Sequence, residues 1–286
     1  MGDLKMSSQV IKEKIGFIGG GNMAKAICEG IIKNGLAQYQ QIIVSGPHIE
    51  NLSWWIERGV TAYTENGRVV DEADVIFLAM KPHILPSAIA NVHETLALPV
   101  KSKLFVSVLA GIQLEQLENV LSPLEECARI IRVMPNTPMM VGEGCTAFCP
   151  GIRATPHDII LVKNILEVSG VCKQVPEAMI NAIGALAGSG PAFVYLIIEA
   201  LADAGVKQGI PRAMAIEMAA QTTLGAAKMV LSTGKHTAVL KDEVCSPGGT
   251  TIAGIHALES GGVRASLFNA VEAAAKRSAE LGQKRN

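Results

Sequence analysis

A glycine-rich segment near the N-terminus combines residue types and spacing that suit phosphate binding. It runs Gly19-Gly20-Gly21-Asn22-Met23-Ala24, the G-x-G-x-x-A form of the dinucleotide-binding fingerprint. The first glycine of that fingerprint permits a tight turn, the second lets backbone approach a pyrophosphate, and the alanine keeps the next helix close to the strand. The N-terminus of that helix offers N–H groups and a partial positive charge to the phosphates. Glycines also serve ordinary strand-to-helix turns, but the position between an expected strand and an expected helix favours a cofactor site.

The end of the second expected strand bears on which dinucleotide is used. An NAD-preferring site usually has an acid there for the ribose 2′-hydroxyl, whereas this chain has Val44-Ser45-Gly46-Pro47-His48 and no acid before Glu50. The missing acid removes a repulsion against a 2′-phosphate, although no arginine takes its place. These residues favour NADPH or the use of both cofactors, and an ordinary loop role for Ser45 stays open.

Two more strand ends carry residues of interest, Ala79-Met80-Lys81-Pro82-His83 and Val108-Leu109-Ala110-Gly111. Ligands of open α/β folds bind at the carboxyl ends of the strands, so we expect both segments near the glycine-rich loop. Lys81 brings a cation to this edge, but an ordinary solvated loop lysine would look the same. We expect His83 to cap or pack.

Residues 14–174 alternate short apolar runs with helical patterns, which is typical of a parallel sheet covered by helices. We expect strands at 15–18, 41–45, 74–80, 103–109, 130–134 and 146–149, and helices at 23–34 and 52–58. The run 74–80 is almost wholly apolar, as in a strand buried on both faces. The predicted fold class is therefore α/β, with a Rossmann-type domain over 14–174 after an N-terminal extension at 1–13.

Residues 175–286 show helical spacing and frequent alanine. Prolines divide this part into helices expected at 177–189, 191–206, 211–232, 236–243 and 249–282. A single layer of helices cannot bury its own apolar faces, so we predict an all-helical dimerisation domain. The apolar stretch 179–202 contains Asn181, Glu199 and a Gly-Ser-Gly-Pro segment, so we expect a buried helix pair and no membrane span.

The composition excludes several classes of protein. Hydrophobic residues make up 49% and charged residues 18%, which allows a sizeable core, and the net charge of −1 gives no attraction for nucleic acid or an anionic membrane. We expect no metal site and reduced thiols at Cys28, Cys127, Cys145, Cys149, Cys172 and Cys245. The N-terminal segment is unlike a signal or transit peptide, and Met6 breaks a myristoylation motif that Gly2 would begin. The expected location is the cytoplasm, with association with mitochondria left open.

A segment in the second half is more specific. Ser246-Pro247-Gly248-Gly249-Thr250-Thr251 opens a helical pattern, and with Met134-Pro135-Asn136-Thr137-Pro138, Ala187-Gly188-Ser189-Gly190-Pro191 and Leu78–His83 it resembles the pyrroline-5-carboxylate reductase family. The resemblance runs from about Lys14 to about Leu281. It implies a Rossmann domain joined to a helical domain that intertwines with a partner into a homodimer, often assembled into a decamer. It also implies hydride transfer from NADPH or NADH to the C=N carbon of L-1-pyrroline-5-carboxylate, the last step of proline biosynthesis.

The same resemblance assigns residues to a site. Those expected to line the cofactor are Gly19, Gly20, Gly21, Asn22, Met23, Ser45, Asn66, Ala79, Met80, Lys81, Pro82, Val108, Leu109 and Ala110, and those expected to face the substrate include Glu177, Thr250 and Thr251. Family members often have a second serine after the position of Ser45, where a 2′-phosphate is held. Gly46 stands there in this chain, which weakens the prediction of NADPH.

The implied chemistry fits the residues. A cyclic imine accepts hydride best as its iminium, so orientation over the nicotinamide matters more than a strong acid or a nucleophile. The backbone of Gly248, Gly249 and Thr250 at a helix N-terminus suits the substrate carboxylate. The Thr251 hydroxyl suits the ring nitrogen, which makes Thr251 the predicted catalytic residue. Taken without the resemblance, Thr250 is better explained as a helix N-cap.

Two rival functions stay open at this point. A hydroxyacid or ketone dehydrogenase of similar two-domain design needs a lysine to protonate the forming alkoxide. Its candidates, which lack the expected glycine-rich pattern, are Lys207, Lys228, Lys235 and Lys241. A dinucleotide-sensing protein without turnover is the second. Cys245 is expected near a helix N-terminus, but imine reduction needs no nucleophile, so we expect this residue only to fill space.

Overall fold

The computed structural model describes residues 10–97, 99, 100, 102–124 and 128–283, with side chains up to residue 280. The chain divides into two compact units, Met1–Gly188 with Ala275–Asn286 and, separately, Ser189–Ala274. The second unit thus begins inside the predicted helical domain. Most of the predicted N-terminal extension, including Gly2 and Met6, lies outside the described residues, and so does Cys127.

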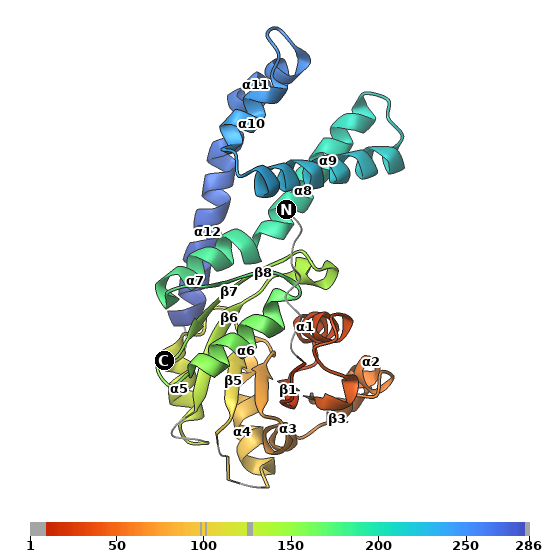
Figure 1. The fold of residues 1–286 in the computed structure, drawn as a ribbon. Helices are drawn as coiled ribbons and strands as arrows, with labels where there is room; N and C mark the ends of the chain where they lie inside the picture. The colour runs from red at the N-terminus through yellow and green to blue at the C-terminus, as the bar shows by residue number, and fades with distance from the viewer. Residues whose placement is uncertain (1–9, 98, 101, 125–127, 284–286) are drawn as a thin grey trace. The chain divides into compact units, whose positions relative to one another are not determined.

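An eight-stranded sheet forms the centre of the first unit, in the order β3-β2-β1-β4-β5-β6-β7-β8 (Figure 1). Its strands are β1(Ile15–Ile18), β2(Ile42–Ser45), β3(Thr61–Tyr63), β4(Val75–Leu78), β5(Leu104–Ser107), β6(Arg129–Met134), β7(Gly144–Pro150) and β8(Gly170–Gln174). Strands β1 to β6 are parallel in the Rossmann order, which confirms the predicted fold class. The sheet is not parallel throughout, because β7 runs antiparallel to β6.

Two strands were not predicted. β3 has three residues, and β8 is an edge strand of sequence GVCKQ with a single buried residue, Cys172. Neither offers the apolar run by which a buried strand is detected in sequence.

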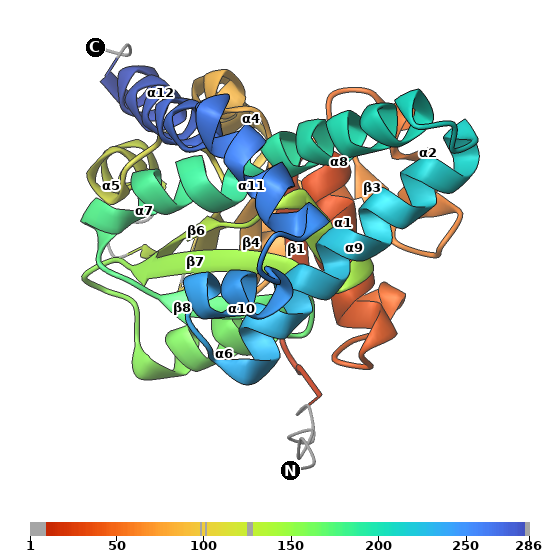
Figure 2. The same cartoon turned by 90° about the horizontal axis from the view of Figure 1, so that it is seen from above.

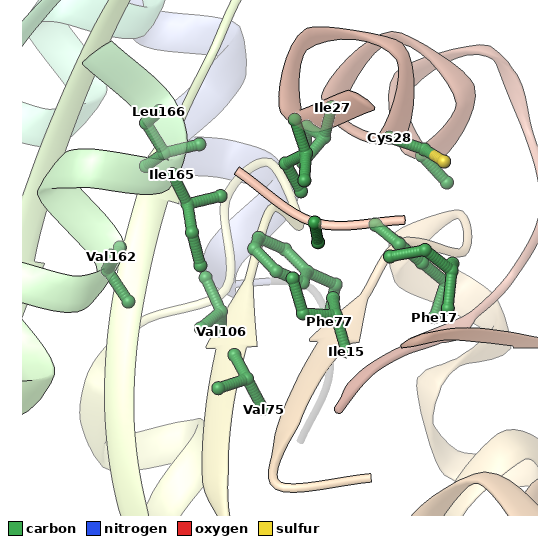
Figure 3. Packing of buried hydrophobic residues seen from close by; sticks show 14 of the residues in the cluster. Ile15, Phe17, Ile27, Cys28, Val75, Phe77, Val106, Val162, Ile165 and Leu166 are labelled. Carbon is green, nitrogen blue, oxygen red and sulfur yellow. The ribbon is translucent and has the colours of Figure 1, made fainter. Parts of the chain in front are cut away.

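Helices cover both faces of the sheet. α1(Asn22–Lys33) and α6(Pro156–Glu167) pack on one face, and α3(Asn66–Glu72), α4(Leu85–Thr95) and α5(Leu114–Leu121) on the other. In β4, Val75 and Phe77 belong to the first core, whereas Ile76 and Leu78 belong to the second. Figure 3 shows Val75 and Phe77 in the first core, with Ile27 of α1 and Ile165 of α6 packed nearby. Burial on both faces explains the unbroken apolar run of this strand.

α7(Glu177–Ile183) continues through a π-helical turn, Gly184–Gly188, and a bend at Ser189 into α8(Gly190–Lys207). α7 and α6 lie on opposite faces of the sheet (Figure 2), and Ile180 of α7 is buried against Met134, Ala147 and Cys149. The two helices expected here are present as α7 and α8, but little of Glu177–Lys207 is buried within the single chain. By length and composition this run is apolar enough to cross a membrane, a test that core helices of soluble proteins also pass.

The second unit is helical throughout. It contains α8, α9(Arg212–Thr233), α10(Thr237–Val244), α11(Thr250–Ser260) and the first part of α12(Val263–Gln283). α8 and α9 pack through a small core of Ala202, Ala215 and Ala219. The expected single helix over 249–282 is wrong, because Gly262 takes a φ of +72° and separates α11 from α12. Large apolar side chains remain exposed in this unit, Leu231 by 78% and Phe268 by 77%.

Candidate active site

The parallel register aligns the ends of four strands at one edge of the sheet. Ile18 pairs with Ser45 and with Leu78, and Leu78 pairs with Ser107. The backbone bonding continues one residue further, because the Gly19 N–H donates to the Ser45 carbonyl at 2.9 Å and the Val108 N–H to the Leu78 carbonyl at 3.2 Å. The structure therefore brings together the predicted cofactor segments Gly19–Met23, Ser45, 79–82 and 108–110.

The glycine loop has the shape of a phosphate cradle. Gly19 has a φ of +101°, and a Cβ there would lie 2.8 Å from the Met80 nitrogen. A Cβ at Gly20 would lie 2.6 Å from Leu52 Cδ2, so both positions are closed by the protein itself. At Gly21, the N-cap of α1, no described heavy atom lies within 4 Å of a Cβ. The first turn of α1 has no acidic residue to occupy its positive end. An open glycine beside a helix N-terminus fits a dinucleotide pyrophosphate.

Ser45 and Asn66, two predicted cofactor residues, are in direct contact. Ser45 is fully buried, and its hydroxyl donates to Asn66 Oδ1 at 2.8 Å. Asn66 is held in place because its backbone N–H donates to Asn91 Oδ1 at 2.8 Å and its Nδ2 to the Ala88 carbonyl at 3.1 Å. The alternative of an ordinary loop residue is wrong for Ser45, which ends β2 and joins a hydrogen-bonded network at the carboxyl edge.

The other predicted cofactor residues present different groups at this edge. Leu109 is 1% exposed and packs in the core with α3, α4 and α5, so its side chain is not available to a ligand. Lys81 and Ala110 are exposed, and Lys81 precedes the short helix η3(Pro82–Ile84). His83 is exposed within η3.

Glu177, predicted from the resemblance to face the substrate, balances a buried cation. Its Oε1 accepts from Arg132 Nη1 at 2.8 Å and from the Leu114 N–H at 2.7 Å, while Arg132 Nη2 donates to Asn181 Oδ1 at 2.8 Å. Arg132 is 1% exposed, so its guanidinium depends on these acceptors. Arg132 was not predicted as a site residue, although an arginine inside the apolar run of β6 was a visible signal.

The Pro-Gly-Gly-Thr-Thr segment forms the start of α11 in the second unit. Gly249 is the N-cap and Thr250 the first helical residue, and the cap has no side-chain hydrogen bond. The explanation of Thr250 as a helix cap is therefore wrong. Gly248 takes a φ of +66°, and the Gly249 N–H donates to the Ser246 carbonyl at 3.0 Å. The glycines build a turn that leads into a helix whose first turn carries Thr250 and Thr251.

Residues of the rival chemistries are poorly placed for them. Cys245 follows the last residue of α10 and so lies at a helix C-terminus, whereas the rival mechanism needs a thiol at a helix N-terminus. Lys235 pairs with Glu243 and Lys241 with Asp242, each at 2.6 Å on exposed surface. Within the described part of the chain, no cluster of three or more potential metal ligands is found.

The buried cysteines pack in the cores. Burial raises the pKa of Cys28 and of Cys172 to about 12 and the pKa of Cys149 to about 11. These groups therefore stay protonated thiols at neutral pH.

Both halves of the chain match known families. The model for pyrroline-5-carboxylate reductase dimerisation matches residues 177–281, and that for NADP oxidoreductase, coenzyme F420-dependent, matches residues 14–111. Pyrroline-5-carboxylate reductase 3 of Danio rerio is 45% identical over 278 residues, 97% of this chain and 94% of the relative. The pyrroline-5-carboxylate reductase of Methanosarcina acetivorans is 43% identical, over 95% of this chain and 99% of the relative.

Solved structures agree with these matches. Plasmodium falciparum pyrroline carboxylate reductase, crystallised with NADP bound, has a TM-score of 0.85 and 32% identity, over 96% of this chain and 99% of that chain. The pyrroline-5-carboxylate reductase of Coxiella burnetii has a TM-score of 0.84 and 35% identity, over 95% and 99% of the two chains. The glycine loop fits a dinucleotide, the helical half matches the dimerisation model, and the relatives are similar over nearly the whole chain. This chain therefore belongs to the pyrroline-5-carboxylate reductase family.

Proposed function

We propose that this chain reduces L-1-pyrroline-5-carboxylate to L-proline, with NADPH or NADH as the hydride donor. The observation that carries the proposal is that the likeness to these reductases spans both the glycine loop and the helical half. A hydroxyacid dehydrogenase of similar design would share only the first of these. The chain is accordingly an oxidoreductase that acts on a C=N bond.

The first unit carries the proposed cofactor-binding residues. The bound nicotinamide provides the hydride. Backbone N–H groups at the start of α1 hold the pyrophosphate, and Gly21 lets it approach closely. The segments 79–82 and 108–110 line the same edge, and Ser45 with Asn66 shapes the ribose end of it.

The start of α11, in the second unit, carries the proposed substrate-binding residues. The backbone at Gly248 and Thr250 binds the substrate carboxylate, and Gly249 keeps the turn close to it. The Thr251 hydroxyl orients the ring nitrogen, donating to the imine or accepting from the iminium. Hydride addition to the iminium carbon leaves a neutral amine, so no further proton is needed in that step. Glu177 remains a proposed substrate contact in addition to its bond to Arg132.

The proposal also covers cofactor choice, assembly and location. The end of β2 has no acid, which favours NADPH. Gly46 has no side chain to hold a 2′-phosphate, so we expect the enzyme to accept NADH as well. The dimerisation match and the exposed Leu231 and Phe268 support a homo-oligomer, which we propose to be a homodimer assembled further into a decamer. The net charge of −1 gives no attraction for nucleic acid or an anionic membrane, so we expect neither as a partner. We also expect a cytoplasmic location, with association with mitochondria left open.

The decisive experiment follows nicotinamide absorbance with the purified full-length chain. We expect NADPH or NADH to be oxidised when L-1-pyrroline-5-carboxylate is added, with proline as the product. Small 2-hydroxy acids with the oxidised cofactor should give no signal. Turnover of a hydroxy acid, or cofactor binding without turnover of the imine, would contradict the proposal and favour one of the two alternatives.

A further inference from the structure

Trp55 contacts the glycine loop from a separate element. It lies in α2(Ser53–Ile56), is fully buried, and donates through Nε1 to the Gly20 carbonyl oxygen at 3.1 Å. Gly20 is the middle glycine of Gly19-Gly20-Gly21, so this hydrogen bond falls within the loop itself. A Cβ built at Gly20 would lie 2.8 Å from the same Nε1, which shows how closely the indole covers the loop.

The indole is held rigidly by its neighbours. Its ring centroid lies 5.4 Å from that of Phe17 and 5.0 Å from that of Trp54 in an edge-on arrangement. Phe17 in turn stacks on Phe77 at 5.0 Å. The Trp55 carbonyl accepts from the Arg58 and Val60 N–H groups, each at 3.1 Å. A buried indole N–H fixed in this way needs an acceptor, and Gly20 provides it.

The direction of one peptide N–H follows from this bond. The Gly20–Gly21 peptide is planar and trans, so its carbonyl and its N–H point in opposite directions. With the Gly20 carbonyl held toward Trp55, the Gly21 N–H points away from the indole. A peptide between two glycines has few steric barriers of its own against reorientation, so a contact from outside the loop is what fixes it. Around Gly21, no described heavy atom lies within 4 Å of a Cβ.

We propose that Trp55 is a positioning residue for the dinucleotide. Its N–H fixes the Gly20–Gly21 peptide so that the Gly21 N–H is presented to the pyrophosphate before the cofactor arrives. Trp55 acts through the loop and touches neither the cofactor nor the imine. This inference rests on the proposed placement of the dinucleotide at Gly19–Met23, which a separate variant tests.

The test compares Trp55→Phe with Trp54→Phe in the full-length enzyme. Phenylalanine at 55 keeps an aromatic ring in the core but has no N–H, and loss of one such bond should raise the NADPH Kd and KM about three- to tenfold. We expect kcat at saturating cofactor and the imine KM to stay at their parent values. Trp54→Phe is the matched control, because Trp54 packs beside Trp55, whereas the hydrogen bond to the Gly20 carbonyl comes from the Trp55 indole.

Fluorescence gives a second readout of the contact between Trp55 and the loop. The chain has two tryptophans, so Trp54→Phe leaves Trp55 as the sole emitter. Saturation with NADP⁺, which does not absorb tryptophan emission, should change the Trp55 spectrum because the loop that accepts its N–H becomes loaded. This measurement also decides the matter if Trp55→Phe does not fold, since unchanged Trp55 emission would overturn the inference.

Gly21→Val separates failure of the inference from failure of the cofactor placement. A rise in cofactor KM for Gly21→Val with none for Trp55→Phe would show that Trp55 only packs, and the inference would be wrong. If both variants kept the cofactor KM of the parent enzyme, the proposed placement of the dinucleotide at Gly19–Met23 would itself be wrong. Equal losses in kcat, imine KM and cofactor KM for Trp55→Phe would also overturn the inference, because they would indicate general damage to the fold.

Discussion

The Ser45 hydroxyl donates to Asn66 Oδ1 at 2.8 Å, and Ser45 is fully buried at the end of β2. The hydroxyl proton of Ser45 is therefore already engaged in a hydrogen bond within the protein. This bond lies at the edge of the sheet where we expect the ribose of the dinucleotide. The next residue, Gly46, has no side chain to offer a 2′-phosphate. The discrimination between NADPH and NADH should therefore respond to a hydroxyl added at position 46.

Gly46→Ser should increase the preference for NADPH. A Cβ at Gly46 would lie 3.3 Å from Leu52 Cδ2, the end of a flexible side chain that can move slightly. One hydrogen bond to a charged phosphate contributes about 1.5–3 kcal/mol, so the ratio of kcat/KM for NADPH over NADH should rise by roughly ten- to a hundredfold. Gly46→Ala has the same Cβ without the hydroxyl and should leave the ratio unchanged. An equal rise in both variants would mean that the hydroxyl is not the cause.

Gly21→Val should impair cofactor binding and spare the fold. The protein leaves the space around this Cβ open, so the added side chain meets the pyrophosphate and not the protein. We expect the cofactor KM to rise at least tenfold, about 1.4 kcal/mol, with the melting temperature of the unliganded protein nearly unchanged. If Gly21→Val kept the cofactor KM of the parent enzyme, the glycine loop would not be part of the cofactor site.

Thr251→Ala should lower imine turnover without affecting the cofactor. The variant removes one hydrogen bond to a nitrogen whose charge changes during reaction, worth about 1.5–3 kcal/mol. The kcat/KM for the imine should then fall by roughly ten- to a hundredfold. Thr251→Ser keeps the hydroxyl and should keep most of the activity. If Thr251→Ala reduces the imine at the parent rate, or loses NADPH affinity instead, the proposed substrate site is misplaced.

Glu177 is expected to serve stability through Arg132. Glu177→Ala leaves a guanidinium that is 1% exposed without its carboxylate, at a cost of about 1–3 kcal/mol in the free energy of unfolding. Glu177→Gln keeps an acceptor oxygen and should lose less in urea unfolding. The proposed second role predicts that the imine KM rises in both variants. An unchanged imine KM in Glu177→Gln would leave Glu177 with the Arg132 contact alone.

The exposed apolar surface of the helical unit should hold the oligomer together. Phe268 is 77% exposed in the single chain, and a charge there would be buried without a partner in an assembled interface. We expect Phe268→Asp to shift sedimentation toward the monomer and to lower imine turnover. Ile152, 90% exposed in the loop between β7 and α6, provides the control as Ile152→Asp. Parent assembly in Phe268→Asp would place the interface elsewhere.

Local sequence determined the elements that carry the site. An unbroken apolar run indicates a strand buried on both faces, and β4 has one because Val75 and Ile76 enter different cores. Glycines at 19 and 21 between such a strand and a helix indicate a phosphate turn without any knowledge of the rest of the fold. The Pro-Gly-Gly-Thr-Thr segment was informative because the resemblance gave it a role, whereas its local pattern alone pointed to a helix cap.

Only the tertiary structure decided how these elements meet. Trp55 reaches Gly20 across 35 residues, Ser45 reaches Asn66 across 21, and Arg132 reaches Glu177 across 45. Each pair depends on strand order and register, which a periodic pattern does not encode. The direction of β7 escaped prediction for a related reason, since the burial pattern of a strand looks the same whichever way the strand runs. The sequence of an element indicates which of its residues are buried and which are exposed. Contacts between residues that are distant in the chain form only when the elements pack around their cores.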